Sequence, residues 1–118
     1  MVVVADVEAA SRWFQQTLGL VSGHGGAEYE MLLDGSELVV QLHRWEADEH
    51  PHLGNPHDPS RGNGIVVWFT TDELDAVLAV VRTAGAEVLE GPLVNPNSGN
   101  REVWLRGPEG YVVVAAGR

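Results

Sequence analysis

Polar side chains alternate along two predicted strands, and their types suit acid–base chemistry or ligand binding. Gln41 and His43 lie two residues apart on one strand, and Glu102 and Arg106 lie four apart on another. Residues two or four apart on a strand face the same side. A histidine can act as a general base, and a glutamate as an acid or orienting group. His43 and Glu102 are therefore the candidate catalytic residues. The alternative is that Glu102 and Arg106 simply pair with each other at a solvated edge.

Three tryptophans lie in or next to the predicted strands, and two of them share the alternation of these polar residues. Trp45 follows His43 by two residues, Trp104 precedes Arg106 by two, and Trp68 lies in a third predicted strand. A cavity lined by tryptophans and a few polar groups suits a flat, partly aromatic ligand. The alternative for each tryptophan is simple packing in the core. Strand alternation gives a predicted ligand-binding set of Gln41, His43, Trp45, Trp68, Trp104, Arg106 and Val114.

Histidines gather in and beside a long polar loop over residues 46–63. His50, His52 and His57 lie in this loop, and His43 lies just before it. Neutral imidazoles bind zinc, so the loop offers one possible metal site. However, the chain has no cysteine to support it, and a proline-rich loop is a poor rigid scaffold. The prediction is a solvated loop without a metal.

The composition narrows the classes of partner. The 118 residues carry 7 basic and 17 acidic side chains, for a formal charge of −10. This charge argues against nucleic acid as a partner and could attract a cationic ligand, although acidity also simply keeps proteins soluble. No apolar run is long enough for a membrane span, and no signal peptide is visible. We expect a cytoplasmic protein that does not bind membranes.

The elements that would position these side chains form a repeat. Asp6 and Asp72 are each followed, thirteen residues later, by a glycine, Gly19 and Gly85. Each pair encloses an amphipathic run, so the aspartate is expected to cap the start of a helix and the glycine its end. The pattern predicts helices over residues 7–18 and 72–84.

Strand-like runs flank both helices. Two helices and about eight strands, with strands dominating each unit, predict an α+β fold. The expected organisation is a single domain over 1–118, with module one over 1–45, a linker loop over 46–63 and module two over 64–118. The strands expected from individual runs cover residues 2–4, 29–33, 37–43, 65–70, 86–89, 102–106 and 111–115, with a loop over 91–100.

The order and spacing of several short motifs resemble the vicinal oxygen chelate superfamily, also called the glyoxalase/bleomycin-resistance/dioxygenase superfamily. The resemblance covers essentially the whole chain and implies two paired βαβββ modules around a cup-shaped site, often in a homodimer. The motifs are Val4-Ala5-Asp6, Trp13-Phe14 and Leu18-Gly19-Leu20 in the first half, and Phe69-Thr70-Thr71-Asp72, Gly85-Ala86-Glu87-Val88 and Gly107-Pro108-Glu109-Gly110-Tyr111 in the second.

The resemblance also implies where metal ligands would stand. The first position would lie before Met1, the second at Gln41, the third at Gly64 or Ile65, and the fourth at Val114. A divalent ion needs several converging nitrogen or oxygen donors, which these residues do not supply. We therefore expect neither this metal site nor a cofactor.

These features lead to one expected function and two alternatives. The first is a metal-free small-molecule-binding protein that sequesters a planar aromatic compound, as a drug-resistance protein would. The second is an enzyme of the same fold, a glyoxalase-like lyase or isomerase or a dioxygenase, acting on a small organic substrate. The third is a metal-dependent enzyme whose first ligand comes from upstream of Met1 or from a dimer partner.

Overall fold

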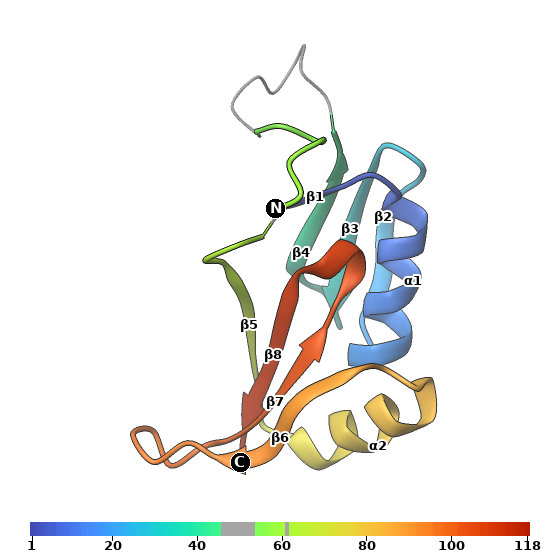
Figure 1. Ribbon diagram of the computed structural model, residues 1–118. Coiled ribbons are helices and arrows are strands. Elements are labelled where there is room, and N and C mark those ends of the chain that lie inside the picture. Colours follow the sequence, from blue (N-terminus) through green and yellow to red (C-terminus); the bar gives the residue numbers. More distant parts are fainter. Residues whose placement is uncertain (46–53, 61) are drawn as a thin grey trace. The chain divides into compact units, whose positions relative to one another are not determined.

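The computed structural model describes residues 1–45, 54–60 and 62–118 and divides the chain into two compact units (Figure 1). Unit one is Met1–Arg61 and unit two is Gly62–Arg118. Each contains a strand, a helix and three further strands, in that order. His50 and His52 lie outside the described residues. The predicted α+β fold of two βαβββ modules is confirmed, whereas the predicted module boundaries and the cup stay predictions.

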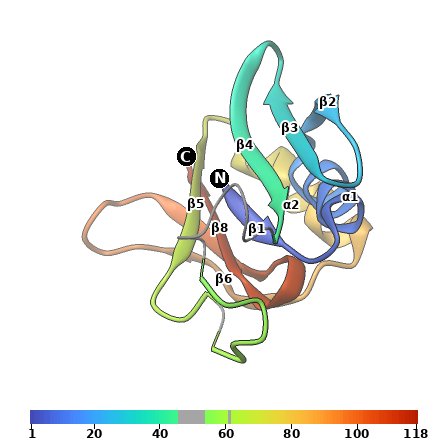
Figure 2. The same ribbon diagram turned by 90° about the horizontal axis from the view of Figure 1, so that it is seen from above.

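The first unit is a four-stranded sheet with one helix. Its elements are β1 (Val2–Val4), α1 (Val7–Leu18), β2 (Val21–Gly25), β3 (Tyr29–Asp34) and β4 (Glu37–Arg44). The strand order is β1-β4-β3-β2, with β1 parallel to β4 and the other pairs antiparallel. The helix packs against β2, β3 and β4 (Figure 2). Its apolar side chains, including Phe14, are buried with Leu32 and Leu42 of the sheet.

The ends of α1 are those that the sequence predicts. The Asp6 carboxylate accepts a hydrogen bond from the Ala9 amide nitrogen at 2.8 Å, which satisfies one of the free donors of the first turn. Gly19 ends the helix in the left-handed conformation, and its amide donates to the Gln15 carbonyl.

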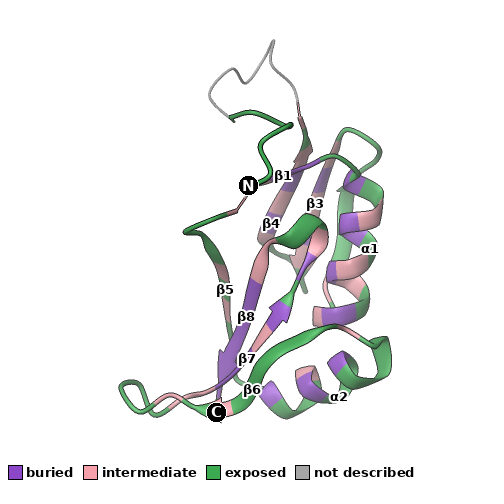
Figure 3. Cartoon of the chain, viewed as in Figure 1, coloured by how far each residue is buried: buried purple, intermediate pink, exposed green. Residues whose placement is uncertain are grey.

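Strand β2 has no counterpart among the predicted strands. Its sequence is Val-Ser-Gly-His-Gly, and all five residues are exposed (Figure 3). The strand pairs with β3 at the edge of the sheet, and its register shifts between Ser22 and His24. Backbone pairing with β3, rather than alternating apolar side chains, therefore defines this strand.

The second unit repeats the arrangement. Its elements are β5 (Val66–Thr71), α2 (Leu74–Ala84), β6 (Val88–Val94), β7 (Arg101–Arg106) and β8 (Val112–Gly117), with a short 3-10 turn at Pro108–Gly110 before β8. The strand order is β5-β8-β7-β6, with β5 parallel to β8. The helix α2 packs against β7 and β8 through a buried apolar stripe.

Two local predictions in this unit are wrong. Helix α2 begins after Glu73, not after Asp72, and the Glu73 side chain makes no capping hydrogen bond. Instead, the Thr71 hydroxyl accepts a hydrogen bond from the Glu73 amide at 3.0 Å. Strand β6 also extends to Val94, through residues predicted as a loop. The chain bulges around Gly91, and the pairing with β7 continues beyond the bulge. Gly91 has a φ of 98°, and a Cβ there would lie 2.6 Å from the Glu102 carbonyl oxygen.

Candidate functional site

The two faces of the second sheet differ. Val103 and Leu105 of β7 are fully buried on the face that α2 covers. Side chains alternate along a strand, so the residues between and beside them lie on the opposite face. We call this opposite face, with its register partners in β5 and β8, the helix-free face. Its members are Val66, Trp68 and Thr70 of β5, Glu102, Trp104 and Arg106 of β7, and Val112, Val114 and Ala116 of β8.

A pair of tryptophans occupies the middle of this face. Trp68 and Trp104 both stand opposite Val114 of the central strand, one from each side. Their ring centroids are 5.9 Å apart and their planes are perpendicular. Val114 is fully buried, whereas Trp68 is 46% exposed and Trp104 is partly exposed. The edge-to-face pair therefore covers an apolar floor and leaves aromatic surface accessible to a ligand.

Glu102 stands next to Trp104 on the same face and is only 4% exposed. Its Oε1 accepts a hydrogen bond from Asn95 Nδ2 at 3.2 Å. Its Oε2 is buried and has no hydrogen-bond partner within the described part of the chain. Burying a carboxylate oxygen without a donor costs free energy, so this atom needs an explanation.

Arg106 closes one end of the helix-free face. Its Nη1 donates a hydrogen bond to the Gly110 carbonyl oxygen at 3.1 Å and so braces the turn before β8. Positions four apart on a strand are separated by about 13 Å. Arg106 is thus turned toward the backbone of its own hairpin, while Glu102 accepts from Asn95. Glu102 and Arg106 are therefore each held by another partner, and not by the pairing with each other that the sequence suggested as an alternative.

The first unit also has a face that its helix does not cover, and this face carries several polar side chains. Gln41 and His43 of β4 stand opposite Met31 and Tyr29 of β3. Gln41 Nε2 donates to the Tyr29 hydroxyl at 3.0 Å, and the Tyr29 and His43 rings lie 6.2 Å apart. Trp45 follows directly after β4 and is half-buried. The first unit therefore has its own group of side chains that can make polar or aromatic contacts.

The orientation of His43 defines its chemistry. Its Nδ1 lies 2.7 Å from the Arg44 carbonyl oxygen. A carbonyl only accepts, so Nδ1 carries the proton, and in the neutral ring Nε2 is the basic nitrogen. The amide of Gln41 similarly uses its donor nitrogen on Tyr29, which leaves the phenolic hydrogen to point elsewhere.

Tyr29 is a candidate site residue that sequence reasoning missed. The tight turn after Asp34 pairs Asp34 with Glu37, and continuing that register would place Tyr29 opposite Leu42, on the helix side. A register shift at Leu32 and Leu33 instead places Tyr29 opposite His43. Such bulges re-aim side chains and leave little trace in a single sequence.

The structure brings the predicted ligand-binding residues together in two groups. Gln41, His43 and Trp45 belong to the first unit, and Trp68, Trp104, Arg106 and Val114 belong to the second. The two candidate catalytic residues are divided in the same way. His43 is half-buried in unit one, and Glu102 is buried in unit two.

The described residues contain no group of three or more His, Cys, Asp or Glu side chains able to hold a metal ion. At two of the positions that the resemblance assigns to metal ligands, the Gln41 amide already donates a hydrogen bond to Tyr29, and Val114 is an apolar side chain beneath two tryptophans. Over the same residues, no helix is long and apolar enough to cross a membrane.

Known proteins share this architecture. A Salmonella typhimurium virulence protein, STM3117, is 20% identical over 115 residues, which are 96% of this chain and 77% of the relative. A protein of unknown function from Agrobacterium tumefaciens superposes with a TM-score of 0.77 at 14% identity, covering 98% of this chain and 88% of its own. TioX from Micromonospora superposes with a TM-score of 0.70 at 19% identity, and the match covers 98% of this chain and 93% of TioX. At these identities, the superpositions show the fold alone.

The family follows from the sequence as a whole. The sequence model of the Glyoxalase/Bleomycin resistance protein/Dioxygenase superfamily matches residues 1–114, nearly the full chain. The βαβββ order of both units agrees with that match. The chain belongs to the glyoxalase/bleomycin resistance protein/dioxygenase superfamily.

Proposed function

We propose that this protein binds a small planar aromatic compound on the helix-free face of its second unit. The observation that carries the proposal is the Trp68–Trp104 pair, whose rings meet at right angles while Trp68 keeps 46% of its surface exposed. A tryptophan that serves only as core would be covered. Stacking on such a surface combines apolar burial with the specific geometry of aromatic contacts.

The proposed binding needs no metal. Three of the ligand positions implied by the family resemblance fall on Gln41, on Gly64 or Ile65, and on Val114. An amide that already donates to Tyr29 and a valine side chain make a poor donor set for a divalent ion. Gln41, His43 and Trp45 stay predicted ligand contacts from the first unit, and Arg106 and Val114 from the second.

An enzyme of the same fold is the second candidate, favoured by one specific observation. The hydrogen bond from His43 Nδ1 to the Arg44 carbonyl fixes the tautomer in which Nε2 is basic, as a general base requires. In this candidate, Glu102 acts as acid or orienting group. A lyase, isomerase or dioxygenase activity that is lost in His43→Gln, with ligand affinity unchanged, would establish it in place of simple binding.

Two further expectations belong with the proposal. A homodimer would cover exposed apolar side chains of the edge strand β5, where Val66 is 42% exposed and the preceding Ile65 is 58% exposed. Sedimentation at high micromolar concentration would reveal a monomer if this expectation is wrong. The cytoplasmic location stays a prediction, and fractionation of the source cells would test it.

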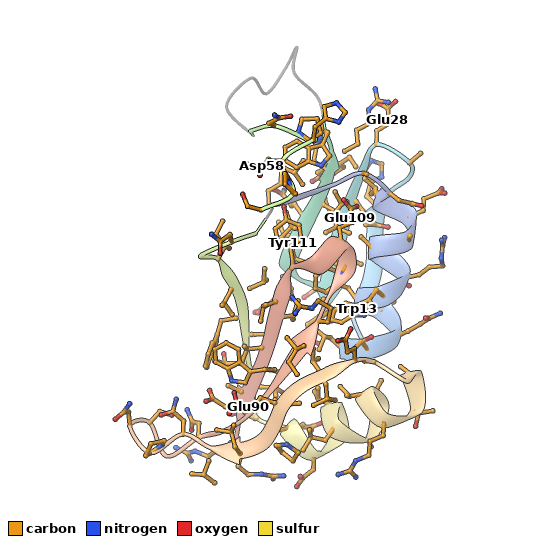
Figure 4. All side chains as sticks on the ribbon, viewed as in Figure 1. Trp13, Glu28, Asp58, Glu90, Glu109 and Tyr111 are labelled. Carbon is orange, nitrogen blue, oxygen red and sulfur yellow. The ribbon has the colours of Figure 1, made fainter. Side chains whose placement is uncertain are left out.

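Tryptophan fluorescence tests the proposed binding site. Titration with 9-aminoacridine, a planar aromatic cation at neutral pH, should quench the emission of the wild-type protein. Trp68→Ala and Trp104→Ala should each weaken binding about tenfold, equivalent to ~1.4 kcal/mol. The matched control is Trp13→Ala, because Trp13 lies on α1 and packs against Phe14 in the other unit (Figure 4). Unchanged affinity in both face variants would refute the proposed site.

A further inference from the structure

Glu102 combines two properties that rarely occur together. Its side chain is 4% exposed, and its Oε2 has no hydrogen-bond partner in the described residues. Buried polar groups are nearly always satisfied, because desolvation without a partner costs on the order of 1–3 kcal/mol and more for a charge. Such an oxygen needs an explanation, and a ligand that supplies the missing donor would provide one.

The surroundings of Glu102 keep this oxygen unsatisfied. Asn95 donates to Oε1, and its own Oδ1 accepts from the amides of Asn97 and Ser98 at 2.9 and 3.4 Å. These backbone bonds fix which end of the Asn95 amide faces Glu102. Asn95 therefore holds the carboxylate in place through one oxygen and leaves the other available.

The position of Glu102 connects the free oxygen to the aromatic pair. Glu102 and Trp104 are two residues apart on β7 and share the helix-free face. Across the sheet, the residue opposite Trp104 is Glu90 of β6, an exposed second carboxylate (Figure 4). The guanidinium of Arg106 is turned to the Gly110 carbonyl. The end of the face beside Trp104 is therefore acidic as well as aromatic.

The chemistry of this arrangement selects the ligand. A carboxylate only accepts hydrogen bonds, so the partner must be a donor. A positively charged N–H donor forms a stronger, charge-assisted bond and neutralises the buried charge. Aromatic faces also attract cations, so the two tryptophans favour the same group. A metal ion is a poorer occupant, because no cluster of three ligating side chains occurs among the described residues.

We propose that Glu102 anchors the ligand by accepting a hydrogen bond from a cationic nitrogen through Oε2. This inference rests on the proposed function and names its ligand class: a planar aromatic compound bearing a protonated amino or amidine group. Trp68 and Trp104 bind the ring, and Glu102 fixes the orientation of the charged end. Asn95 is a positioning residue that holds Glu102.

A matched pair of probes tests the role of Glu102. At neutral pH 9-aminoacridine is a cation, whereas acridine has the same ring system and is neutral. Both are titrated against the wild type, Glu102→Gln and Glu8→Gln. The Glu102→Gln variant keeps a side-chain oxygen for the Asn95 bond, but it loses the charge and replaces the acceptor Oε2 with an amide nitrogen that only donates. Glu8 is an exposed glutamate on α1 of the first unit, so its variant makes the same change in net charge outside the helix-free face of the second unit.

The expected result is selective. Glu102→Gln should weaken 9-aminoacridine tenfold or more and change acridine less than twofold, while Glu8→Gln changes both less than twofold. Equal binding of both probes, with no effect of Glu102→Gln, overturns the role of Glu102 and leaves the proposed function intact. If neither probe quenches the tryptophans of the wild type, the proposed function fails and the role of Glu102 fails with it.

Discussion

The two modules share one order of elements, yet each buries a glutamate in a different way. Glu30 of the first module is 6% exposed and lies between sheet and helix. Its Oε2 accepts from the Ser11 hydroxyl at 3.1 Å, and the single hydroxyl hydrogen of Ser22 is shared between Oε1 at 3.0 Å and Oε2 at 2.9 Å. Glu102 of the second module is as deeply buried, on the face away from the helix, with a single donor on one oxygen.

This contrast separates a structural carboxylate from a functional one. Glu30 has both oxygens satisfied by its own module, so it ties α1 to β2 and β3. Glu102 has an incomplete set of partners, which is useful only if something else completes it. Natural proteins violate local rules mainly at functional sites, and the second module does so at the residue beside its aromatic pair.

The sheet faces that the helices leave uncovered also differ between the two modules. The first presents a hydrogen-bonded group of Tyr29, Gln41 and His43. The second presents two tryptophans over an apolar floor. Duplicated architecture therefore carries different chemistry in each half, and the aromatic half suits the binding of a flat ligand.

Removing the structural carboxylate should give the largest effect on stability. Glu30→Ala leaves the buried Ser11 hydroxyl without its acceptor and should lower the free energy of unfolding by about 3 kcal/mol. Urea denaturation measures this as a lower midpoint. Glu30→Gln keeps one acceptor oxygen and should cost less. A change below about 0.5 kcal/mol in Glu30→Ala, on the order of a surface substitution, would contradict the structural assignment.

The helix caps offer a second comparison between the modules. Asp6→Ala removes the hydrogen bond to the Ala9 amide and should cost about 1 kcal/mol. Asp72 is not the cap of α2, so Asp72→Ala should cost less than about 0.5 kcal/mol. Thermal unfolding of the two variants side by side gives the difference. Equal losses would mean that Asp72 caps its helix after all.

Glu102→Gln should leave stability unchanged or raise it slightly. The substitution replaces an unsatisfied buried anion with an uncharged amide, which costs less to bury, and it retains an acceptor oxygen for Asn95. We expect a change in unfolding free energy within about 0.5 kcal/mol of the wild type, or a gain. A loss above about 1 kcal/mol in urea denaturation would place Glu102 with Glu30 as a structural residue.

Removal of metal should have no effect. The proposed site uses tryptophans and a carboxylate, so a chelator should leave both the melting temperature and the binding of 9-aminoacridine unchanged. Elemental analysis of the purified protein should give less than one divalent ion per chain. One tightly bound zinc, nickel or iron ion per chain would favour the metal-dependent enzyme among the alternatives.

Much of the fold could be predicted because local signals repeat. The spacing from Asp6 to Gly19, and from Asp72 to Gly85, predicted both helices, and both glycines end them in the left-handed conformation. Alternation along β7 correctly placed Glu102, Trp104 and Arg106 on one face. Strand β2 escaped prediction because it lacks apolar alternation, and the continuation of β6 because its bulge at Gly91 looks like a turn.

The candidate site was less predictable because it depends on contacts far apart in the sequence. The place of Tyr29 beside His43 follows from a register shift, and the free oxygen of Glu102 follows from the way residues 95–98 orient one amide. Neither is a property of residue type. The sequence could nominate Trp68, Trp104 and Glu102, but only the sheet register joins them on one face.

The central claim is that a planar aromatic cation binds on the helix-free face of the second module, and the four tryptophans can report it directly. In a nitrogen-15 correlation spectrum, each indole N–H gives its own signal, assigned by replacing each tryptophan in turn with phenylalanine. On addition of 9-aminoacridine, the signals of Trp68 and Trp104 should shift together and saturate, while the Trp13 signal stays in place. A shift of Trp13 with Trp68 and Trp104 unmoved would contradict the account.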